Sequence, residues 1–549
     1  MVIIMKKNSF VEGTIIAYLS ILITKIVGAI YVIPFYKIIG ESGGVLYSYA
    51  YNIYNLFLNI STSGIPTAVA IIISEYNALK MFNEREHTYK VANKLISCIS
   101  FVAFLVMFIF AKQLGLFFIG DLEGTNSINS VVLVIRVISL CLLVVPFLSV
   151  TRGYLQGNKY VSPSSLSQLL EQIARIFIVL VGSYVAINVL HFSVPIGVSV
   201  ALFGTVFGAG IALLYLKLKI KKNKSQFMEG VSVPLKSTVA TKEIIKKIIK
   251  HAFPIIIIAI TQNLYEMVDL RFIIRGLYMI GYTGADSEIL GSIVVTWTPK
   301  ICMLINALAI GLCTSIIPFI VESYTKKDIK QVNNKFNQAI NTILFVGIPL
   351  SVFIISFSYM IYYIFYGASV YGNIVLSMMS IVSIFFSIHM VVNMMLQGMK
   401  KYKIVYLNTF TGLTVNAVLD IPMILLLNKI GFYPYLGTLM STVIGQIVSL
   451  TIVFISLKKE HKFKFGSIFK TLTKTLLPII SMIITILILK LFINNNGTYL
   501  IKIIKLGIVG IISIGVYVLV AIKNKSLQTI LGEDIINKIL NKLKIKKKV

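Results

Sequence analysis

Long apolar runs alternate with short polar connections along the whole chain. A run of about 20 residues lets a helix cross the roughly 30 Å hydrocarbon layer of a membrane, and about fourteen such runs can be read. They lie near residues 12–36, 44–72, 91–114, 129–150, 163–187, 193–216, 251–280, 290–321, 336–360, 374–397, 404–428, 434–457, 474–493 and 499–521. The pattern therefore predicts an all-α polytopic membrane protein with about 14 transmembrane helices.

Two sequence motifs occur twice within these apolar runs. The two copies are Gly64-x-x-Thr67 with Glu75 and Gly311-x-x-Thr314 with Glu322, and also Leu155-Gln156-Gly157 and Leu396-Gln397-Gly398. A duplicated helix bundle is the usual architecture of a secondary transporter. We therefore predict two six-helix lobes plus two C-terminal helices, in a chain expected to be a monomer. The predicted parts are an N-lobe (1–216), a basic cytoplasmic linker (217–250), a C-lobe (251–457) and two final helices with a basic cytoplasmic tail (458–549).

Lysine and arginine gather in alternate connections between the predicted spans. If the first lysines are cytoplasmic, the same side holds the basic segments 80–94, 152–159, 217–250, 326–335, 400–403 and 458–474 and the basic tail. This is the positive-inside bias, which predicts a multi-pass protein of the cell membrane with both termini in the cytoplasm. Lys502 and Lys505, early in the last span, fit this bias least well.

Composition excludes several classes of protein. Hydrophobic residues make up 57% of the 549 positions and the mean hydropathy is +0.89, which is too apolar for a soluble core. The net charge of +31 comes from lysines scattered through membrane-flanking loops, so anionic membrane lipids are expected partners and nucleic acid is not. The chain carries no nucleotide-binding loop, no H-E-x-x-H and no Cys/His metal spacing. We therefore expect neither enzymatic activity nor a metal or other cofactor, with transport driven by a gradient, by potential or by substrate supply.

Ionisable residues inside the predicted spans are the candidate functional groups. Each costs about 2.5–3.5 kcal/mol or more at membrane depth, so each needs a partner or a water-filled cavity. The set consists of Lys25, Arg136, Glu171, Arg175, Glu266, Asp269, Arg271, Arg275, Lys300 and Asp420. Superposing the two copies places Lys25 opposite Glu266, which predicts a gating or cation-linked pair lining a cavity between the lobes.

Some of these residues also have a structural interpretation. Glu171 and Arg175 are four apart with the acid first, the favourable order for a pair within one helix, and Arg152 lies at a membrane boundary. Gly64 and Pro66 are expected to shape a broken or kinked helix. We assign all five residues structural or gating roles.

Carboxylates within the spans indicate coupling to an ion. Glu266, Asp269 and Asp420 can each be neutralised by Na⁺ or H⁺ during a transport cycle, although Asp420 can also be satisfied locally. These three residues are therefore the candidates for ion coupling.

Several segments resemble those of one known family. They are Thr24-Lys25-Ile26-Val27-Gly28, Ser61-Thr62-Ser63-Gly64-Ile65-Pro66-Thr67-Ala68 with Glu75, and Arg152-Gly153-Tyr154-Leu155-Gln156-Gly157. With these segments the first lobe resembles the SpoVB/YtgP branch of the MurJ-like lipid II flippases, in the MOP exporter superfamily of polysaccharide biosynthesis proteins. The resemblance implies a MATE/MOP-like fold, with fourteen helices in two six-helix lobes plus a final pair.

The resemblance also implies a function. It implies export of a cell-wall precursor linked to undecaprenyl diphosphate, such as lipid II, by alternating access. Lys25 and Lys300 fall at or near basic positions of the family and would contact the diphosphate. The chain departs from the family at Tyr31-Val32, where relatives usually place an arginine. Arg275 is our candidate replacement for that missing cation.

The sequence is compatible with other functions. A MATE-type cation-coupled multidrug exporter shares the two-lobe plan but would favour an acidic cavity and needs only twelve helices. A flippase for another lipid-linked polysaccharide unit fits the same residues, and so does either a vegetative or a sporulation role. A scaffold without transport gives no reason for charges at membrane depth.

Overall fold

All regular elements of the described chain are helices. The computed structural model describes residues 30–120, 124–232, 237–491 and 498–527, with residues 16, 20, 23–25, 27 and 28 and without the side chains of 304, 308, 310 and 313–318. Within these residues, 11 helical segments are long and apolar enough to cross a membrane. The predicted all-α membrane architecture is confirmed, whereas the number of fourteen spans stays a prediction. The termini, whose cytoplasmic location the charge pattern predicts, lie outside the described residues.

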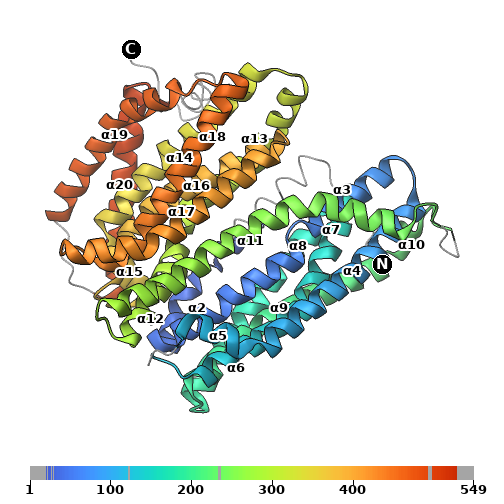
Figure 1. Ribbon diagram of the computed structural model, residues 1–549, viewed down its shortest axis with the longest axis horizontal. Helices are drawn as coiled ribbons and strands as arrows, with labels where there is room; N and C mark the ends of the chain where they lie inside the picture. Colours follow the sequence, from blue (N-terminus) through green and yellow to red (C-terminus); the bar gives the residue numbers. More distant parts are fainter. Residues whose placement is uncertain are drawn as a thin grey trace. The chain divides into compact units, whose positions relative to one another are not determined.

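The chain divides into two compact units, Met1–Val295 and Thr296–Val549. Figure 1 colours them from blue to green and from yellow to red. The helices of the first unit are α2 (Val32–Thr62), α3 (Ile65–Ala78), α4 (Phe82–Ile109), α5 (Ala111–Ile119), α6 (Ile128–Ser139), α7 (Val145–Gly157), α8 (Val161–Phe177), α9 (Val194–Lys222), α10 (Lys224–Met228), α11 (Thr241–Met279) and α12 (Gly284–Ser292). A 3₁₀ turn joins α6 to α7, and two π-helical turns extend α8 to Val189.

The second unit is built from eight described helices. They are α13 (Thr298–Thr325), α14 (Ile329–Ser356), α15 (Ser358–Tyr366), α16 (Gly372–Gly398), α17 (Tyr402–Lys429), α18 (Gly437–His461), α19 (Gly466–Leu491) and α20 (Tyr499–Lys523). The division at Val295 comes later than the predicted lobe boundary, because α11 and α12 pack against α2. The two units are separated according to contacts between helices, whereas the predicted lobes are defined by the sequence repeat. The lobe boundaries therefore stay a prediction.

The internal repeat is visible in the helix boundaries. Helices α4 and α14 both have 28 residues, and α5 and α15 both have 9. Each pair is separated by an offset of 247 positions, from 82 to 329 and from 111 to 358. The turns match as well: Lys80 and Lys327 have φ of 58° and 59°, and Lys159 and Lys400 have φ of 67° and 57°. These matches support the predicted duplication in the α4–α5 and α14–α15 segments and at the two turns.

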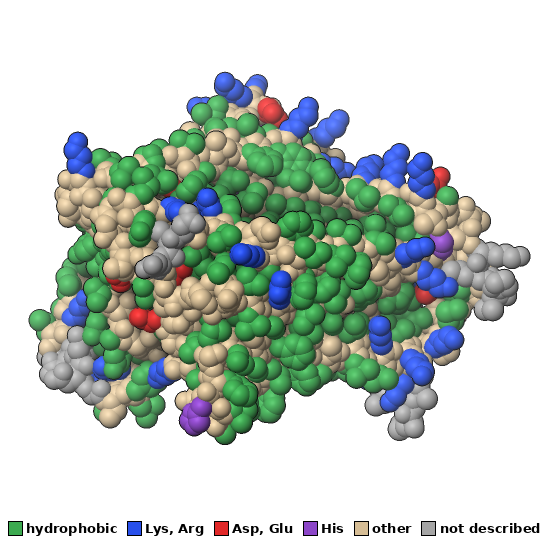
Figure 2. All heavy atoms as spheres, turned by 60° about the horizontal axis from the view of Figure 1, so that its bottom comes forward, with side chains coloured by type: hydrophobic (Ala, Val, Ile, Leu, Met, Phe, Trp, Pro, Cys, Tyr) green, Lys and Arg blue, Asp and Glu red, His purple; other side chains and the backbone are tan. Residues whose placement is uncertain are grey.

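The apolar surface is the one that a bilayer requires. Hydrophobic side chains cover most of the face drawn in Figure 2. Phe101, Val102, Ile173 and Phe177 of the first unit are all more than half exposed. Because lipid tails solvate such side chains, their exposure is favourable in a membrane and not in water.

A break between α2 and α3 brings the start of α3 against α11. Gly64 has φ +80°, and Pro66 occupies the first turn of α3, where a missing N–H costs nothing. A Cβ atom on Gly64 would lie 2.6 Å from the carbonyl oxygen of Ala252 in α11. Both the backbone conformation and this close approach therefore require glycine.

We expect Gly64→Ala to destabilise the protein more than Gly40→Ala does. Gly40 also has a positive φ, of 66°, but a Cβ atom added there would meet nothing within 4 Å. The Gly40→Ala variant therefore measures the cost of the backbone conformation without a steric clash. That cost is about 1–2 kcal/mol, and overpacking at Gly64 should add roughly 1–3 kcal/mol. Thermal unfolding of the purified variants in detergent measures the difference. Equal losses of stability would contradict the close approach of α3 and α11.

Candidate functional site

Arg175 is the centre of a polar cluster within the first unit. It lies on α8 and donates a hydrogen bond to Gln172 Oε1, one turn earlier. It interacts electrostatically with the tyrosines Tyr31, Tyr47 and Tyr51. Its Nε atom is shielded from solvent and has no hydrogen-bond partner within the described part of the chain. We call these residues, together with Lys25, the Arg175 cluster.

Close packing of α8 on α9 fixes the backbone of this cluster. A Cβ atom on Gly208 of α9 would lie 2.5 Å from the carbonyl oxygen of Glu171 and 3.1 Å from Cβ of Arg175. Small residues let membrane helices approach this closely, and van der Waals packing then holds them together. The turn of α8 that carries Arg175 is therefore positioned by a neighbouring helix.

An ion pair elsewhere on α8 leaves Arg175 available. Glu171 accepts a hydrogen bond from Arg152 of α7 at 2.8 Å, and the Arg152 Nε atom donates to Ser167 at 2.8 Å. Glu171 therefore forms its ion pair with Arg152, although it still attracts Arg175, the partner that the helical spacing indicated. The Arg152–Glu171 pair joins α7 to α8.

Lys25 contributes a second cation to the Arg175 cluster. It lies in a helical segment before α2 and interacts electrostatically with Arg175 as a like charge. Three residues later, a Cβ atom on Gly28 would lie 3.3 Å from Nε2 of Gln172, so this segment packs against α8. Two cations on separate helical segments are thus close enough to repel each other, an arrangement that an anion would stabilise.

Tyrosines of α2 form the wall next to these cations. The rings of Tyr47 and Tyr51 are stacked with centroids 5.3 Å apart, and Tyr47 also meets Phe35 edge to face. Tyr31 precedes α2 and is buried. At the position where the family usually has an arginine, this chain therefore places a tyrosine that interacts with Arg175. Sequence reasoning gave Arg175 only a structural or gating role, although its occurrence as one of six arginines in a lysine-rich chain was a usable signal.

Two carboxylates of α11, Glu266 and Asp269, belong to the surroundings of Tyr51. Glu266 interacts with Asp269, and Tyr51 interacts electrostatically with both Glu266 and Arg175. Asn263 donates a hydrogen bond to the carbonyl oxygen of Asn55 at 2.9 Å, which ties α11 to α2. Lys25 and Glu266 form no ion pair within the residues that the structure describes. Their predicted pairing therefore remains a hypothesis about another conformation.

Arg275 lies away from the Arg175 cluster. Its guanidinium group occupies the space next to Gly120, just after α5, where a Cβ atom would overlap it. Arg271 donates to the carbonyl oxygen of Phe117 in α5 and stacks on that ring at 4.3 Å. Arg275 follows Glu266 by nine residues, which is roughly 13 Å along a helix axis. The two arginines of α11 therefore contact the end of α5.

Lys300 lies in the second unit, near the start of α13. Its Nζ atom is 4.1 Å from the centre of the Trp297 ring. The Tyr366 hydroxyl donates to the carbonyl oxygen of Trp297 at 2.8 Å, which attaches this turn to α15. These contacts of the Lys300 turn all lie within the second unit. That Lys300 and Lys25 contact the same diphosphate stays a prediction.

Asp420 forms a second polar cluster, between α17 and α18. It is fully buried and accepts hydrogen bonds from Ser441 and, at 3.5 Å, from Asn416. Thr442 donates to the Asn416 side chain at 2.8 Å. The Asp420 carboxylate is thus satisfied locally by an amide N–H and a hydroxyl, one of the two interpretations that the sequence allowed, and a bound proton or hard cation would have to replace these donors. No group of three or more His, Cys, Asp or Glu side chains able to hold a metal ion occurs in the described chain.

Two family models match the chain. The model described as "Polysaccharide biosynthesis protein" matches residues 10–285, and the MatE model matches residues 254–421. The first match lies within the first unit, and the second match extends from the first unit into the second.

Curated relatives and solved structures agree with these matches. The chain is 30% identical to "Lipid II flippase MurJ" of Bacillus subtilis (strain 168), over 84% of this chain and 85% of that protein. It is 23% identical to "Stage V sporulation protein B" of the same organism, over 66% and 68%. Among solved structures, it is similar to "Lipid II flippase MurJ, inward closed conformation", with a TM-score of 0.64, 17% identity and coverage of 93% and 99%. An inward-facing MATE family multidrug resistance transporter gives a TM-score of 0.61 at 14% identity, over 79% and 98%.

Proposed function

Because the chain belongs to the MurJ-like members of the MOP superfamily, we propose that it is a flippase for lipid II, a cell-wall precursor linked to undecaprenyl diphosphate. The observation that carries this proposal is the Arg175 cluster. Lys25 and Arg175 bring two positive charges together at membrane depth, and Tyr31, Tyr47 and Tyr51 surround Arg175. Neither cation forms an ion pair within the described residues, so a diphosphate can supply the negative charge that pairs with them.

The proposed cycle follows from this placement of charge. The diphosphate binds Lys25 and Arg175 while the sugars and peptide stay in water, and rearrangement of the helices exposes the site to the other side. An inside-negative membrane potential assists outward movement of an anion by about 2.3 kcal/mol per charge per 100 mV. Arg275 and Lys300 remain candidates for contacts made later in the cycle. We place the protein in the cell membrane with both termini in the cytoplasm.

The carboxylates provide a way to reset the transporter. Asp420 is buried among Asn416, Ser441 and Thr442, so binding of Na⁺ or H⁺ would neutralise a charge that is costly at this depth. Glu266 and Asp269 lie next to each other on α11, and their mutual repulsion also favours a cation. We therefore propose that binding of one of these ions drives the return of the empty protein.

A MATE-type exporter of cationic drugs is the second candidate function. Glu266 and Asp269 favour it, because adjacent carboxylates can bind an organic cation. The cations Lys25 and Arg175 oppose it, since both would repel an organic cation that binds near Tyr51. Drug resistance of cells that express the chain distinguishes the two functions.

Complementation tests the proposed substrate. We expect the chain to restore growth to a bacterium depleted of its own lipid II flippases, because the Arg175 cluster can bind the diphosphate. Growth and labelling of lipid II on the outer surface are the measurements. Normal membrane insertion without growth or surface lipid II would reject lipid II as the substrate. A parallel strain that lacks a flippase for another lipid-linked polysaccharide then tests the wider substrate class.

A further inference from the structure

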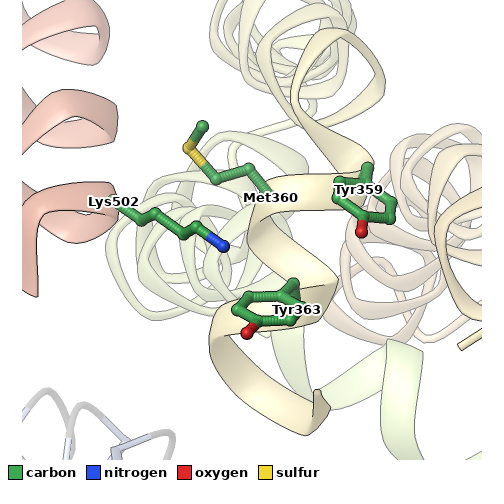
Figure 3. Close-up of a pocket in the computed structure, with 4 residues that line it drawn as sticks. All are labelled: Tyr359, Met360, Tyr363 and Lys502. Carbon is green, nitrogen blue, oxygen red and sulfur yellow. The ribbon is translucent and has the colours of Figure 1, made fainter. Parts of the chain in front are cut away.

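A small hollow in the second unit is lined by helices that do not carry the Asp420 cluster. Tyr359, Met360 and Tyr363 of α15 line it together with Lys502 of α20, and it is open to the surface. The Lys502 Nζ atom is 3.9 Å from the centre of the Tyr363 ring. Figure 3 shows the lysine side chain reaching from α20 toward that ring. The transport mechanism proposed above uses none of these residues.

A second lysine lies at the end of the neighbouring helix. Lys490, in the last turn of α19, has its Nζ atom 5.3 Å from the centre of the Phe357 ring, at the junction of α14 and α15. The Tyr499 hydroxyl donates to the carbonyl oxygen of Ile364 at 2.8 Å, which fixes the first turn of α20 on α15. Lys490 and Lys502 therefore approach the two ends of one short aromatic segment, 357–363.

No carboxylate is available in these helices to neutralise the lysines. The sequence contains no Asp or Glu in residues 329–419 or 461–532. These ranges include all of α14, α15, α16, α19 and α20, the helices that form this corner of the unit. Cation–π contacts place a lysine without removing its charge. Within the residues that the structure describes, neither Lys490 nor Lys502 forms an ion pair with a carboxylate, so an anion from outside the protein can balance these charges.

The position of the lysines also opposes the charge bias of the chain. Lys490 ends α19, whereas the lysine-rich segment 458–474 lies at the start of that helix. Membrane proteins avoid lysine in connections on the side opposite to their basic loops. A function at this end of the helices explains why the chain retains lysines there.

Exposed apolar side chains next to the lysines indicate what kind of molecule brings the anion. Leu487, Ile488 and Leu491 of α19 are 57%, 51% and 82% exposed, and Leu500 and Ile504 of α20 are 65% and 52% exposed. Such surfaces contact lipid tails in a membrane. A molecule that contacts both the lysines and the exposed apolar side chains would carry a phosphate for the lysines and acyl chains for the surfaces of α19 and α20.

We propose that Lys502 and Tyr363 bind the phosphate of an anionic glycerophospholipid in the leaflet opposite to the basic loops, with Lys490 adding positive charge at the other end of segment 357–363. The bound lipid lies between the ends of α19 and α20 and the aromatic segment 357–363. It holds the last two helices on α15 without taking part in binding of the transported precursor.

Lipid titration of the purified protein tests this site. We expect phosphatidylglycerol to raise the thermal unfolding midpoint in detergent, and native mass spectrometry to show the retained lipid. Each lysine near a membrane surface strengthens binding of an anionic lipid roughly fivefold. The double variant K490Q/K502Q should therefore bind phosphatidylglycerol roughly 25-fold more weakly than the unchanged protein. Y363L should also weaken binding, because it removes the ring that positions Lys502.

Matched controls separate this site from general charge effects. Lys470→Gln removes one exposed charge from the other end of α19 and should leave phosphatidylglycerol binding unchanged. Phosphatidylcholine should give no comparable stabilisation, and without added lipid the double variant should unfold as the unchanged protein does. Equal affinity of the double variant, or an equal loss in K470Q, would overturn the proposal. Preferential binding of undecaprenyl phosphate at these lysines would assign the site to the precursor lipid instead and would likewise overturn it.

Discussion

Lys25→Gln and Arg175→Gln should each abolish most lipid II export while leaving membrane insertion and folding intact. Both residues belong to the Arg175 cluster, and the two cations interact with each other as like charges. Removing one partner of a buried charge contact costs about 2–5 kcal/mol, which corresponds to a loss of roughly thirtyfold or more. The folded empty protein should tolerate the change, since it also removes the repulsion between the two cations.

Export is measured as the exposure of labelled lipid II on the outer surface of proteoliposomes. Lys112→Gln is the matched control, because this exposed lysine of α5 is not part of the cluster. The conservative variant Arg175→Lys keeps the charge but loses the planar fork of donors, so we expect partial activity. Full export by both K25Q and R175Q would remove the Arg175 cluster as the diphosphate site.

The same assay ranks the other predicted diphosphate ligands. Arg275 packs next to Gly120, and Lys300 contacts Trp297. We proposed that Arg275 and Lys300 contact the diphosphate only later in the cycle. Arg275→Gln and Lys300→Gln should therefore reduce the rate of export less than K25Q does. An effect as large as that of K25Q would place them at the initial binding site.

Asp420→Asn should remove the dependence of export on an ion gradient. Asparagine keeps the shape of the side chain but lacks the charge that Na⁺ or H⁺ would neutralise, and it can still accept from Ser441. The gradient-driven rate should fall by about 5- to 150-fold, the usual range of a coupling free energy between sites. Lipid II binding should remain, because the Arg175 cluster is unchanged.

Proteoliposomes with imposed Na⁺, pH or potential gradients measure this dependence. Glu322→Gln serves as the control, since Glu322 is an exposed residue of the same unit that pairs with Lys326. Accessibility of an introduced cysteine shows whether D420N is held in one conformation. A variant that keeps the gradient response of the unchanged protein would exclude Asp420 from ion coupling, leaving Glu266 and Asp269 as the candidates.

The sequence by itself determined the class of protein and its helices. Apolar length decides this, because a bilayer accepts only segments whose backbone hydrogen bonds are all internal. The sequence also revealed the duplication, which the equal lengths of α4 and α14 confirm. It identified the ionisable residues worth attention, because the cost of a charge at membrane depth makes each of them informative.

Only the tertiary structure decided which of these charges meet. Helical spacing paired Glu171 with Arg175, but α7 brings Arg152 to Glu171 at 2.8 Å, and Arg175 interacts with Lys25 and the tyrosines as well as with Glu171. Spacing likewise gave no partner for Arg275, which packs next to Gly120 just after α5. The physical reason is that a sequence period fixes the face of a helix on which a residue lies. Which residue of a neighbouring helix meets that face depends on how closely the two helices approach. Gly208, for example, lets α9 approach α8 closely at Glu171.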